Sequence, residues 1–497
     1  MTLHDDAAYR ALTTHDARFD GRLFVGVTST GVYCRPVCRV RTPRRENCRF
    51  FANAALAESN GFRPCLRCRP EMAPGLSLTD SSSVLAQQAA LMLEVAAHEG
   101  SDPALPDIAG RLGVTDRHLR RIFAQAHGVT PIDYLTTRRL LLAKQLLTDT
   151  AMPVTQVALA SGYASLRRFN AAFSERYRMS PSALRRERID APHGPRSTAP
   201  AEAAATVRLA YRPPYDLDGV LAFFANRAVA GVEQVEAQAL RRTLAVTHRG
   251  KALAGWIEAR FVPARHELHL QLAPALVPAL GIVVQRMRQC LDLDADPAQI
   301  DPVLAPVPGP DRPGIRLCGS ADGFESAVRV ILGQQVTVAA ARTLTRRLVD
   351  RFGTPLETPF PGLNTLFPDA ATIAAADPEV VGKLGIVRQR VGALQALARA
   401  VVEGRLLLHR GAPLEATLAA LHELPGIGDW SAQLIVMRAL AWPDAWPATD
   451  IGILNALSTR HARQAAAQSE AWRPWRAYAV MKLWLGLEPP AKASMNE

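Results

Sequence analysis

Apolar side chains recur at two different spacings along this chain of 497 residues, and the spacing divides it into regions. From residue 81 to about residue 187 they recur every three or four positions, which predicts amphipathic helices. From about 207 to 270 short apolar and β-branched runs alternate with turns, which predicts strands at 243–248, 254–261 and 267–272. From about 323 to 486 the spacing is helical again. Residues 189–206 are rich in proline and alanine, which predicts a linker between two functional halves.

The first helical region contains an internal repeat, with copies at 105–134 and 152–184. Each copy predicts a short helix, a turn at a glycine (Gly113, Gly162) and a second helix that begins after a hydroxyl residue (Thr115, Ser165). The apolar face of the second helices is predicted to comprise Leu119, Ile122, Phe123 and Ala126 in the first copy, and Leu166, Phe169 and Phe173 in the second. The opposite faces carry arginines. This is the helix-turn-helix pattern, whose second helix enters the major groove of DNA. An ordinary helical hairpin is the alternative, and the second copy weakens it.

Composition adds limits on the partner and the compartment. The chain is too long for a single core, and its net charge of +12 favours a polyanionic partner. The polar N-terminus does not resemble a secretory signal, and no apolar run approaches the ~20 residues of a membrane helix. Seven cysteines, four of them in close pairs, argue against a disulfide framework. We therefore expect a cytoplasmic protein that does not enter a membrane.

Two close pairs of cysteines, Cys34 with Cys38 and Cys65 with Cys68, lie near the start of the chain. This spacing predicts a four-thiolate zinc site. Arginines crowd both pairs, which suggests that the site meets nucleic acid. On spacing alone, a purely structural zinc knuckle is the favoured interpretation.

The stretches TGVYCRPVCRVR and RENCRFFANAALAESNGFRPCLRCRP resemble the zinc domain of the Ada adaptive-response family. The repeated helix-turn-helix resembles the AraC-type domain that follows it in that family. The resemblance implies that zinc-bound Cys34 accepts a methyl group from a DNA methylphosphotriester. Zinc keeps a thiol as the nucleophilic thiolate, and methylation removes a negative charge that opposes DNA binding. The residues that stand at the family's DNA contacts are Thr30, Arg39, Arg41 and Arg63.

A second motif lies in the C-terminal helical region. The segment LPGIGDWSA at 424–432 has a Gly-x-Gly turn that lets backbone N–H groups approach a phosphate, and Asp450 follows in WPATDIG. With FESAVRVILGQQVTVAAARTLTRRLV and WRPWRAYAVMKLWLG, these stretches resemble the AlkA-type helix-hairpin-helix 3-methyladenine glycosylases over about 207–490. The resemblance implies that Asp450 is the catalytic carboxylate, which stabilises a cationic sugar and orients water.

The same resemblance assigns further roles. Trp430 and Trp484 would stack on a flipped, electron-poor base, and Gln335 would fill the gap in the duplex. Gly426 and Gly428 would shape the hairpin and contact DNA. A monovalent cation is a further candidate cofactor, held by the carbonyl oxygens of His422, Leu424 and Ile427. The plainer alternatives are that Asp450 is a helix cap or surface acid, that the tryptophans are core residues, and that the His422 side chain is only solvent-exposed.

Several residues differ from the patterns of the two families, and these differences limit the activities that we expect. Trp430 stands where bifunctional relatives have a lysine, so we expect a monofunctional glycosylase without strand cleavage. Leu434 replaces a tyrosine and Gln335 replaces a leucine, which puts the range of accepted bases in doubt. Neither Cys290 nor Cys318 has the Pro-Cys-His-Arg context of the second Ada methyl acceptor, so we expect no direct repair of O6-methylguanine.

The sequence thus predicts a multidomain, mainly α protein. The expected parts are an α+β zinc domain (1–76), an all-α double helix-turn-helix domain (82–188), the linker (189–206), an α+β AlkA N-terminal domain (207–318) and an all-α helix-hairpin-helix glycosylase domain (319–490). The predicted cofactor is one Zn²⁺. The predicted partners of this bacterial, nucleoid-associated monomer are double-stranded DNA and RNA polymerase. A regulator with a non-catalytic glycosylase-like half and a constitutive glycosylase anchored by its N-terminal half are the alternatives.

Overall fold

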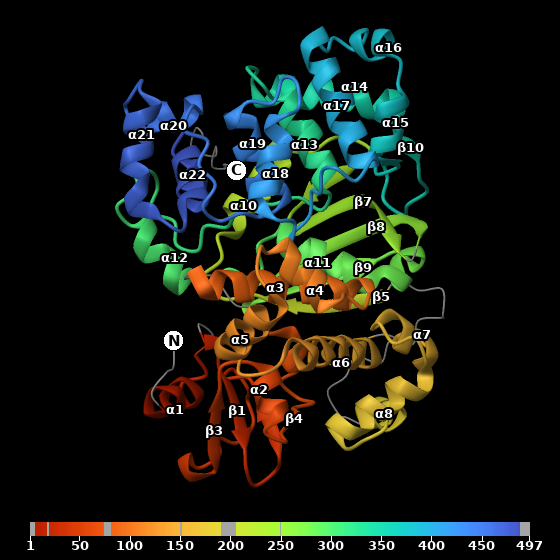
Figure 1. Ribbon diagram of the computed structural model, residues 1–497, viewed down its shortest axis with the longest axis vertical. Coiled ribbons are helices and arrows are strands. Elements are labelled where there is room, and N and C mark those ends of the chain that lie inside the picture. Colours follow the sequence, from red (N-terminus) through yellow and green to blue (C-terminus); the bar gives the residue numbers. More distant parts are fainter. Residues whose placement is uncertain are drawn as a thin grey trace, which may run out of the picture.

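The structure is a computed structural model that describes residues 5–16, 19–73, 81–149, 152–189, 205–248 and 250–487. Figure 1 shows the chain rising from a small N-terminal sheet, through a layer of helices and a larger sheet, to C-terminal helices at the other end. Within these described ranges no helix combines the length and apolar character needed to cross a bilayer. The mainly helical, multidomain fold expected from the sequence is therefore confirmed.

The N-terminal region is a four-stranded sheet flanked by two helices, α1 (Asp5–Thr13) and α2 (Ala54–Ser59). The strands β1 (Phe24–Val27), β2 (Val32–Cys34), β3 (Cys48–Phe51) and β4 (Arg63–Pro64) have the order β3-β1-β2-β4. Strands β2 and β4 run parallel, with Tyr33 opposite Pro64. Because Cys34 and Cys65 lie at the carboxyl ends of these neighbouring strands, the pairing brings the two cysteine pairs together.

The next region consists of seven helices: α3 (Ser81–Glu99), α4 (Leu105–Arg111), α5 (Asp116–His127), α6 (Pro131–Asp149), α7 (Val154–Ala160), α8 (Leu166–Tyr177) and α9 (Pro181–Ile189). Thr115 and Ser165 cap α5 and α8, accepting hydrogen bonds from the backbone N–H groups of His118 and Arg168. Gly113 and Gly162 have positive φ, as expected at the turns. Both helix-turn-helix units are therefore present as predicted.

Two residues of the predicted apolar faces lie elsewhere. Ala126 is exposed on α5, and Leu166 is 38% exposed at the first position of α8. Phe123, Phe169 and Phe173 are fully buried and fill the two cores. Leu166 is exposed because the helix begins at this residue, one position after its cap, where its side chain lies at the edge of the buried face.

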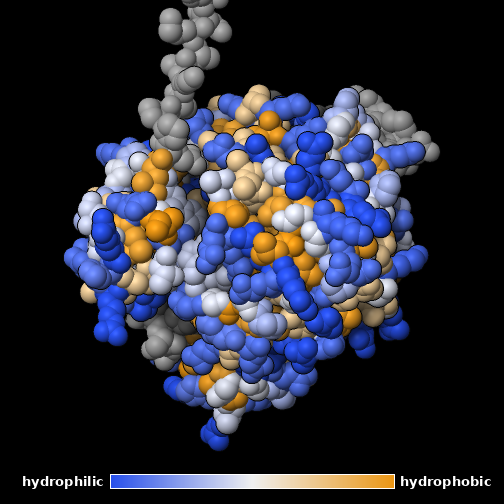
Figure 2. All heavy atoms as spheres, turned by 90° about the horizontal axis from the view of Figure 1, so that it is seen from above, coloured by the Kyte–Doolittle hydropathy of each residue, from blue (hydrophilic) through white to orange (hydrophobic). Residues whose placement is uncertain are grey.

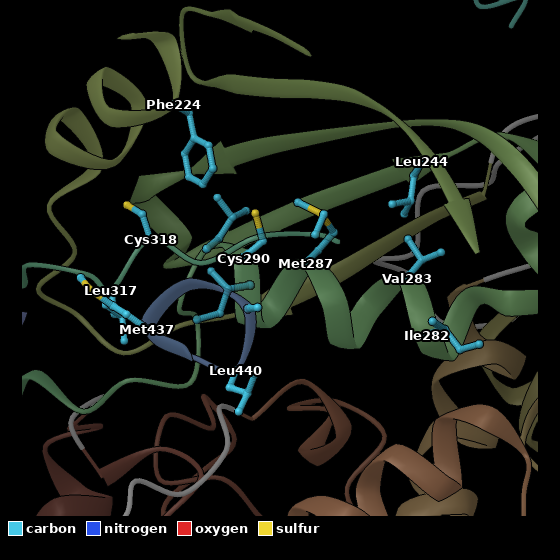
Figure 3. Close-up of a cluster of buried hydrophobic side chains, with 14 of the residues drawn as sticks. Phe224, Leu244, Ile282, Val283, Met287, Cys290, Leu317, Cys318, Met437 and Leu440 are labelled. Carbon is cyan, nitrogen blue, oxygen red and sulfur yellow. The ribbon is translucent and has the colours of Figure 1, made fainter. Parts of the chain in front are cut away.

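The larger sheet has the order β5-β9-β8-β7-β6, all antiparallel. Its strands are β5 (Ala205–Ala210), β6 (Glu233–Glu236), β7 (Ala239–His248), β8 (Lys251–Val262) and β9 (Glu267–Leu272). The three predicted strands are confirmed, and β7 and β8 are longer than expected. The helices of this region are α10 (Leu217–Arg227), α11 (Leu280–Cys290) and α12 (Pro297–Leu304). Figure 3 shows side chains of α10, α11 and the sheet meeting Met437 and Leu440 of the C-terminal region in one apolar cluster.

The C-terminal region is helical, apart from a short pairing of β10 (Thr354–Pro355) with β11 (Thr365–Leu366). Its helices are α13 (Gly323–Leu332), α14 (Val338–Phe352), α15 (Ala370–Ala375), α16 (Pro378–Gly382), α17 (Arg388–Val402), α18 (Leu414–His422), α19 (Asp429–Ala439), α20 (Ile451–Ala456), α21 (Ala462–Ser469) and α22 (Arg476–Leu485). Helices α18 and α19 flank the Gly-x-Gly turn, as the sequence predicts.

The two halves of the chain share one apolar core. Leu146 of α6, with Phe169 and Phe173 of the second helix-turn-helix, belongs to the same buried cluster as Val207 and Leu270 of the larger sheet. Helix α3 also packs against α11. The predicted linker falls mostly on residues 190–204, outside the described ranges. Its two ends nevertheless belong to halves that are in extensive contact, so the first interpretation of two merely tethered halves is too simple.

Candidate functional site

The four paired cysteines come together at the edge of the small sheet. The sulfur atoms of Cys34, Cys38, Cys65 and Cys68 all lie within 4.8 Å of one another. Tetrahedral zinc with ~2.3 Å bonds to sulfur needs sulfurs about 4 Å apart, so this cluster fits Zn²⁺. Three of the cysteines are buried and Cys68 is partly exposed. Cys48, which has no partner at metal spacing, lies in a separate apolar cluster with Val25 and Leu12.

An apolar cavity of about 10 Å³ lies against the cluster. Its walls include Cys34 and Cys38 together with Val25, Val27 and Val40. A volume of about 10 to 15 Å³ is the space that one water-sized group needs. The space beside these two sulfurs is therefore at the lower limit of what a single water-sized group needs.

The predicted DNA-contact residues of this region lie near its surface. Thr30, Arg39 and Arg41 are exposed, and Arg63 is half-buried at the start of β4. Arg35, in the same run of arginines, behaves differently. It is buried, and its guanidinium forms an ion pair with the buried carboxylate of Asp20. One arginine beside the cysteines is therefore internal and fixes the loop.

A buried carboxyl connects the small sheet to the second helix-turn-helix. Glu58 of α2 accepts hydrogen bonds from the hydroxyl groups of Tyr33 (2.9 Å) and Thr137 (3.3 Å), and Arg176 of α8 lies 3.8 Å away. Burial raises the pKa of the Glu58 carboxyl to about 7, although Arg176 opposes the shift. Sequence reasoning missed this contact because a lone glutamate carries no local signal.

The outward faces of the helix-turn-helix units carry exposed cations. Arg117, Arg120 and Arg121 project from α5, and Arg167 and Arg168 from α8. Arg120 is paired with Asp116 on its own helix. The others leave a basic surface of the kind that meets phosphate and base edges.

Asp450 lies at the start of α20, and both of its carboxylate oxygens accept hydrogen bonds. Trp430 donates its indole N–H to Oδ2 at 2.9 Å, and Trp484 donates to Oδ1 at 3.0 Å. The backbone N–H of Ile453 also donates to Oδ1 at 3.0 Å, so Asp450 caps the helix. Asp450 is 9% exposed, and both tryptophans are half-buried. Three residues that are distant in sequence thus hold one carboxylate in a fixed orientation.

The helix-hairpin-helix turn lies beside this carboxylate. Gly426 has a φ of +78°, which favours glycine, and Gly428 leaves open space where a side chain would stand. Gln334 donates to the Gly426 carbonyl and to the Ser431 hydroxyl, at 2.8 and 2.9 Å. Gln334 was not among the predicted site residues, because its hydrogen bond to Gly426 joins positions that are 92 residues apart in the sequence.

Gln335 is exposed between α13 and α14, with a φ of +52°. Such a conformation is uncommon for a residue other than glycine and is often kept for function. Apolar side chains near it in sequence, Val336 and Val338, are also exposed, as is Ile451 directly after Asp450. Figure 2 shows apolar patches between charged side chains on the upper end of the molecule. His422, whose carbonyl oxygen was a candidate cation ligand, has an exposed side chain 3.9 Å from Asp429.

Comparison with known proteins agrees with the families that the sequence resembles. Four family descriptions match: Metal binding domain of Ada (residues 7–71), Helix-turn-helix domain (108–187), AlkA N-terminal domain (206–322) and HhH-GPD superfamily base excision DNA repair protein (328–476). A probable bifunctional transcriptional activator/DNA repair enzyme AlkA of Mycobacterium tuberculosis is 36% identical over 98% of both chains.

This chain belongs to the Ada/AlkA-type family of bifunctional transcriptional activators and DNA repair enzymes. DNA-3-methyladenine glycosylase 2 of Escherichia coli is 36% identical over 56% of this chain and 95% of its own length. The Escherichia coli Ada enzyme is 34% identical over 26% of this chain and 34% of its own length. The resemblances seen in the sequence are therefore confirmed, as is the Ada-type zinc site of four cysteines.

Proposed function

We propose that the C-terminal half hydrolyses the N-glycosidic bond of alkylated bases such as 3-methyladenine, with Asp450 as the catalytic carboxylate. The observation that carries this proposal is the carboxylate of Asp450, held by the indole N–H groups of Trp430 and Trp484 beside the hairpin. A fixed negative charge stabilises the positive charge that develops on the sugar as the base departs. An alkylated purine is already cationic and leaves without strong acid catalysis, so an aromatic pocket is sufficient.

We infer that the glycosylase is monofunctional, since strand cleavage through a Schiff base needs an amine at the site. Only two lysines occur between residues 323 and 487. Lys482 is buried and donates to the carbonyl oxygen of Leu304, and Lys383 is exposed at the end of α16. Trp430 occupies the contact with Asp450 that a catalytic lysine would need.

We propose that Cys34 accepts the methyl group of a DNA methylphosphotriester. A bound zinc ion would keep the four sulfurs deprotonated at neutral pH. The Cys34 sulfur would form a bond to the methyl carbon, whose bond to the phosphate oxygen breaks, leaving an ordinary phosphodiester anion and a thioether. The clustering of the four sulfurs, with Cys34 among them, supports this assignment, because it fits the metal that would keep the thiolate nucleophilic.

Thr30, Arg39, Arg41 and Arg63 would hold the DNA backbone at the cysteine site, and Gln335, Gly426 and Gly428 would contact DNA at the glycosylase site. We also propose a monovalent cation at the hairpin, contact of the activator half with RNA polymerase, and action as a monomer on DNA in the bacterial cytoplasm. The five regions expected from the sequence remain the proposed domain boundaries.

Release of bases from alkylated genomic DNA, identified by mass, tests the glycosylase assignment. Wild-type protein should release 3-methyladenine and Asp450→Asn should not, although both bind DNA. Asparagine can still accept the cap hydrogen bond, so the fold of α20 is preserved. Equal release by the two proteins would refute the role of Asp450. Transfer of one methyl group to protein from methylphosphotriester DNA, lost in Cys34→Ala, tests the second assignment.

A further inference from the structure

The N-terminal sheet and the glycosylase half meet at a buried, charged contact. The backbone carbonyl of Asp20 accepts a hydrogen bond from Nε of Arg212 at 2.7 Å. Two residues farther along, Arg22 forms an ion pair with Asp296. Arg212 and Asp296 are both completely buried. A buried arginine of the glycosylase half therefore donates to a carbonyl group of the cysteine-containing domain, in addition to the carbonyls of Asp294 and Ala295 in its own half.

The same Asp20 is fixed from the other side by the cysteine loops. Nε of Arg35, the residue directly after Cys34, donates a hydrogen bond to the Asp20 carboxylate at 2.8 Å. The backbone N–H of Arg35 donates to the Cys68 sulfur at 3.3 Å, and its guanidinium donates to the Cys68 carbonyl at 3.1 Å. Few apolar side chains pack around the cysteines, among them Val32 and Val40. Such loops depend on the bound metal for their structure, as in other small metal-binding domains.

The contact continues toward the catalytic carboxylate. The carbonyl of Arg212 accepts a hydrogen bond from Arg316 at 2.5 Å, and Arg316 also donates to the carbonyl of Asp292 at 3.3 Å. The carboxylate of Asp292 accepts the hydroxyl of Tyr478 at 2.8 Å. Tyr478 lies on α22, the helix that carries Trp484 and so one of the donors to Asp450.

We propose that the metal-loaded cysteine centre sustains the glycosylase of the same chain through the Asp20–Arg212 and Arg22–Asp296 contacts. With the metal bound, the loops hold Asp20 and Arg22 against the larger sheet. When the metal is lost, Arg212 and Asp296 lose these partners, the support of α22 weakens and excision slows. The proposal rests on the zinc and glycosylase assignments, and it makes base excision depend on the state of the sensor domain.

Tryptophan fluorescence tests the proposal, because all seven tryptophans, Trp256 to Trp484, lie in the glycosylase half. Thermal unfolding of the full chain is followed by this signal with zinc bound and after chelation under reducing conditions. In the metal-free protein, the unfolding transition reported by tryptophan fluorescence should have a midpoint about 5 °C lower than with zinc bound. Single-turnover excision should fall by about fivefold or more. The unfolding readout needs no excision, so an error in the glycosylase assignment is recognised separately.

Two arginine variants of the same domain provide the matched comparison. Arg22→Gln removes the ion pair with Asp296, whereas Arg44→Gln removes an exposed pair with Glu46 inside the domain. Arg22→Gln should lower the tryptophan midpoint with zinc bound and make it less sensitive to chelation, and Arg44→Gln should behave as wild type. The proposal is overturned if chelation releases zinc but leaves the tryptophan transition and excision unchanged, or if the two variants respond alike.

Discussion

Replacing either tryptophan beside Asp450 with phenylalanine separates two roles of the indole ring. Phenylalanine keeps an aromatic face that can stack on a flipped base, but it has no N–H group to donate. In Trp430→Phe the Oδ2 atom of Asp450 loses its 2.9 Å hydrogen bond, and in Trp484→Phe the Oδ1 atom loses its 3.0 Å bond and keeps the one from Ile453. We expect both variants to bind DNA normally and to excise 3-methyladenine slowly.

The size of the effect follows from the charge of the acceptor. A hydrogen bond to a charged group contributes about 1.5 to 3 kcal/mol, and each 1.4 kcal/mol changes a rate about tenfold. Loss of one donor that orients the carboxylate should therefore slow single-turnover excision by about 10- to 100-fold. Trp430→Phe should be the slower variant, because Oδ2 has no other donor among the described residues, whereas the helix cap still holds Oδ1.

The assay is single-turnover release of 3-methyladenine from a duplex at saturating enzyme, with DNA affinity measured separately. Trp256→Phe is the matched control, since Trp256 packs edge-on against Phe360 at 5.1 Å and has no contact with Asp450. If the tryptophans serve only for stacking, both phenylalanine variants will keep rates within about threefold of wild type. That result would refute the positioning role, because a loss of about 1.5 kcal/mol or more would slow excision by more than about tenfold.

Three further outcomes are expected. In the folded protein the pKa of Glu58 is about 7, above its unfolded value of about 4.5, so the folded state binds a proton more readily. The protein should therefore lose up to about 3 kcal/mol of folding stability as the pH rises from about 4.5 to 7. Unfolding midpoints of Glu58→Gln should be less dependent on pH across that window. Gly426→Ala should destabilise the protein by about 1 kcal/mol in denaturant titrations, because of its positive φ and the Cβ of Ala393 at 3.2 Å. Gly428→Ala should leave stability unchanged, since its φ is −88° and the space is open, yet weaken DNA binding in a fluorescence polarisation titration.

The features that were predictable from the sequence are those encoded locally. The caps Thr115 and Ser165, the turn glycines and the paired cysteines each sit at a fixed short spacing, so the pattern alone specifies the structure. Arg212 and Glu58 carried no such signal. A charged side chain normally predicts exposure. Both residues are buried instead, and their partners are distant in sequence: Asp20 lies 192 residues from Arg212, and Thr137 lies 79 residues from Glu58. The apolar core shared by the two halves was missed for the same reason, since helix and strand periodicity shows which face is buried but not against what.

The helix-cap role of Asp450 and its proposed catalytic role need not be alternatives. As the N-cap of α20 its Oδ1 atom accepts the Ile453 N–H, which fixes the carboxylate relative to the helix. The two indole donors then fix its rotation. Oδ2 carries one donor against two on Oδ1, so in the proposed reaction Oδ2 would be the oxygen with the freer lone pair to face the sugar. A carboxylate held in this way needs little reorganisation when positive charge develops beside it, which is the condition under which electrostatic stabilisation is strongest.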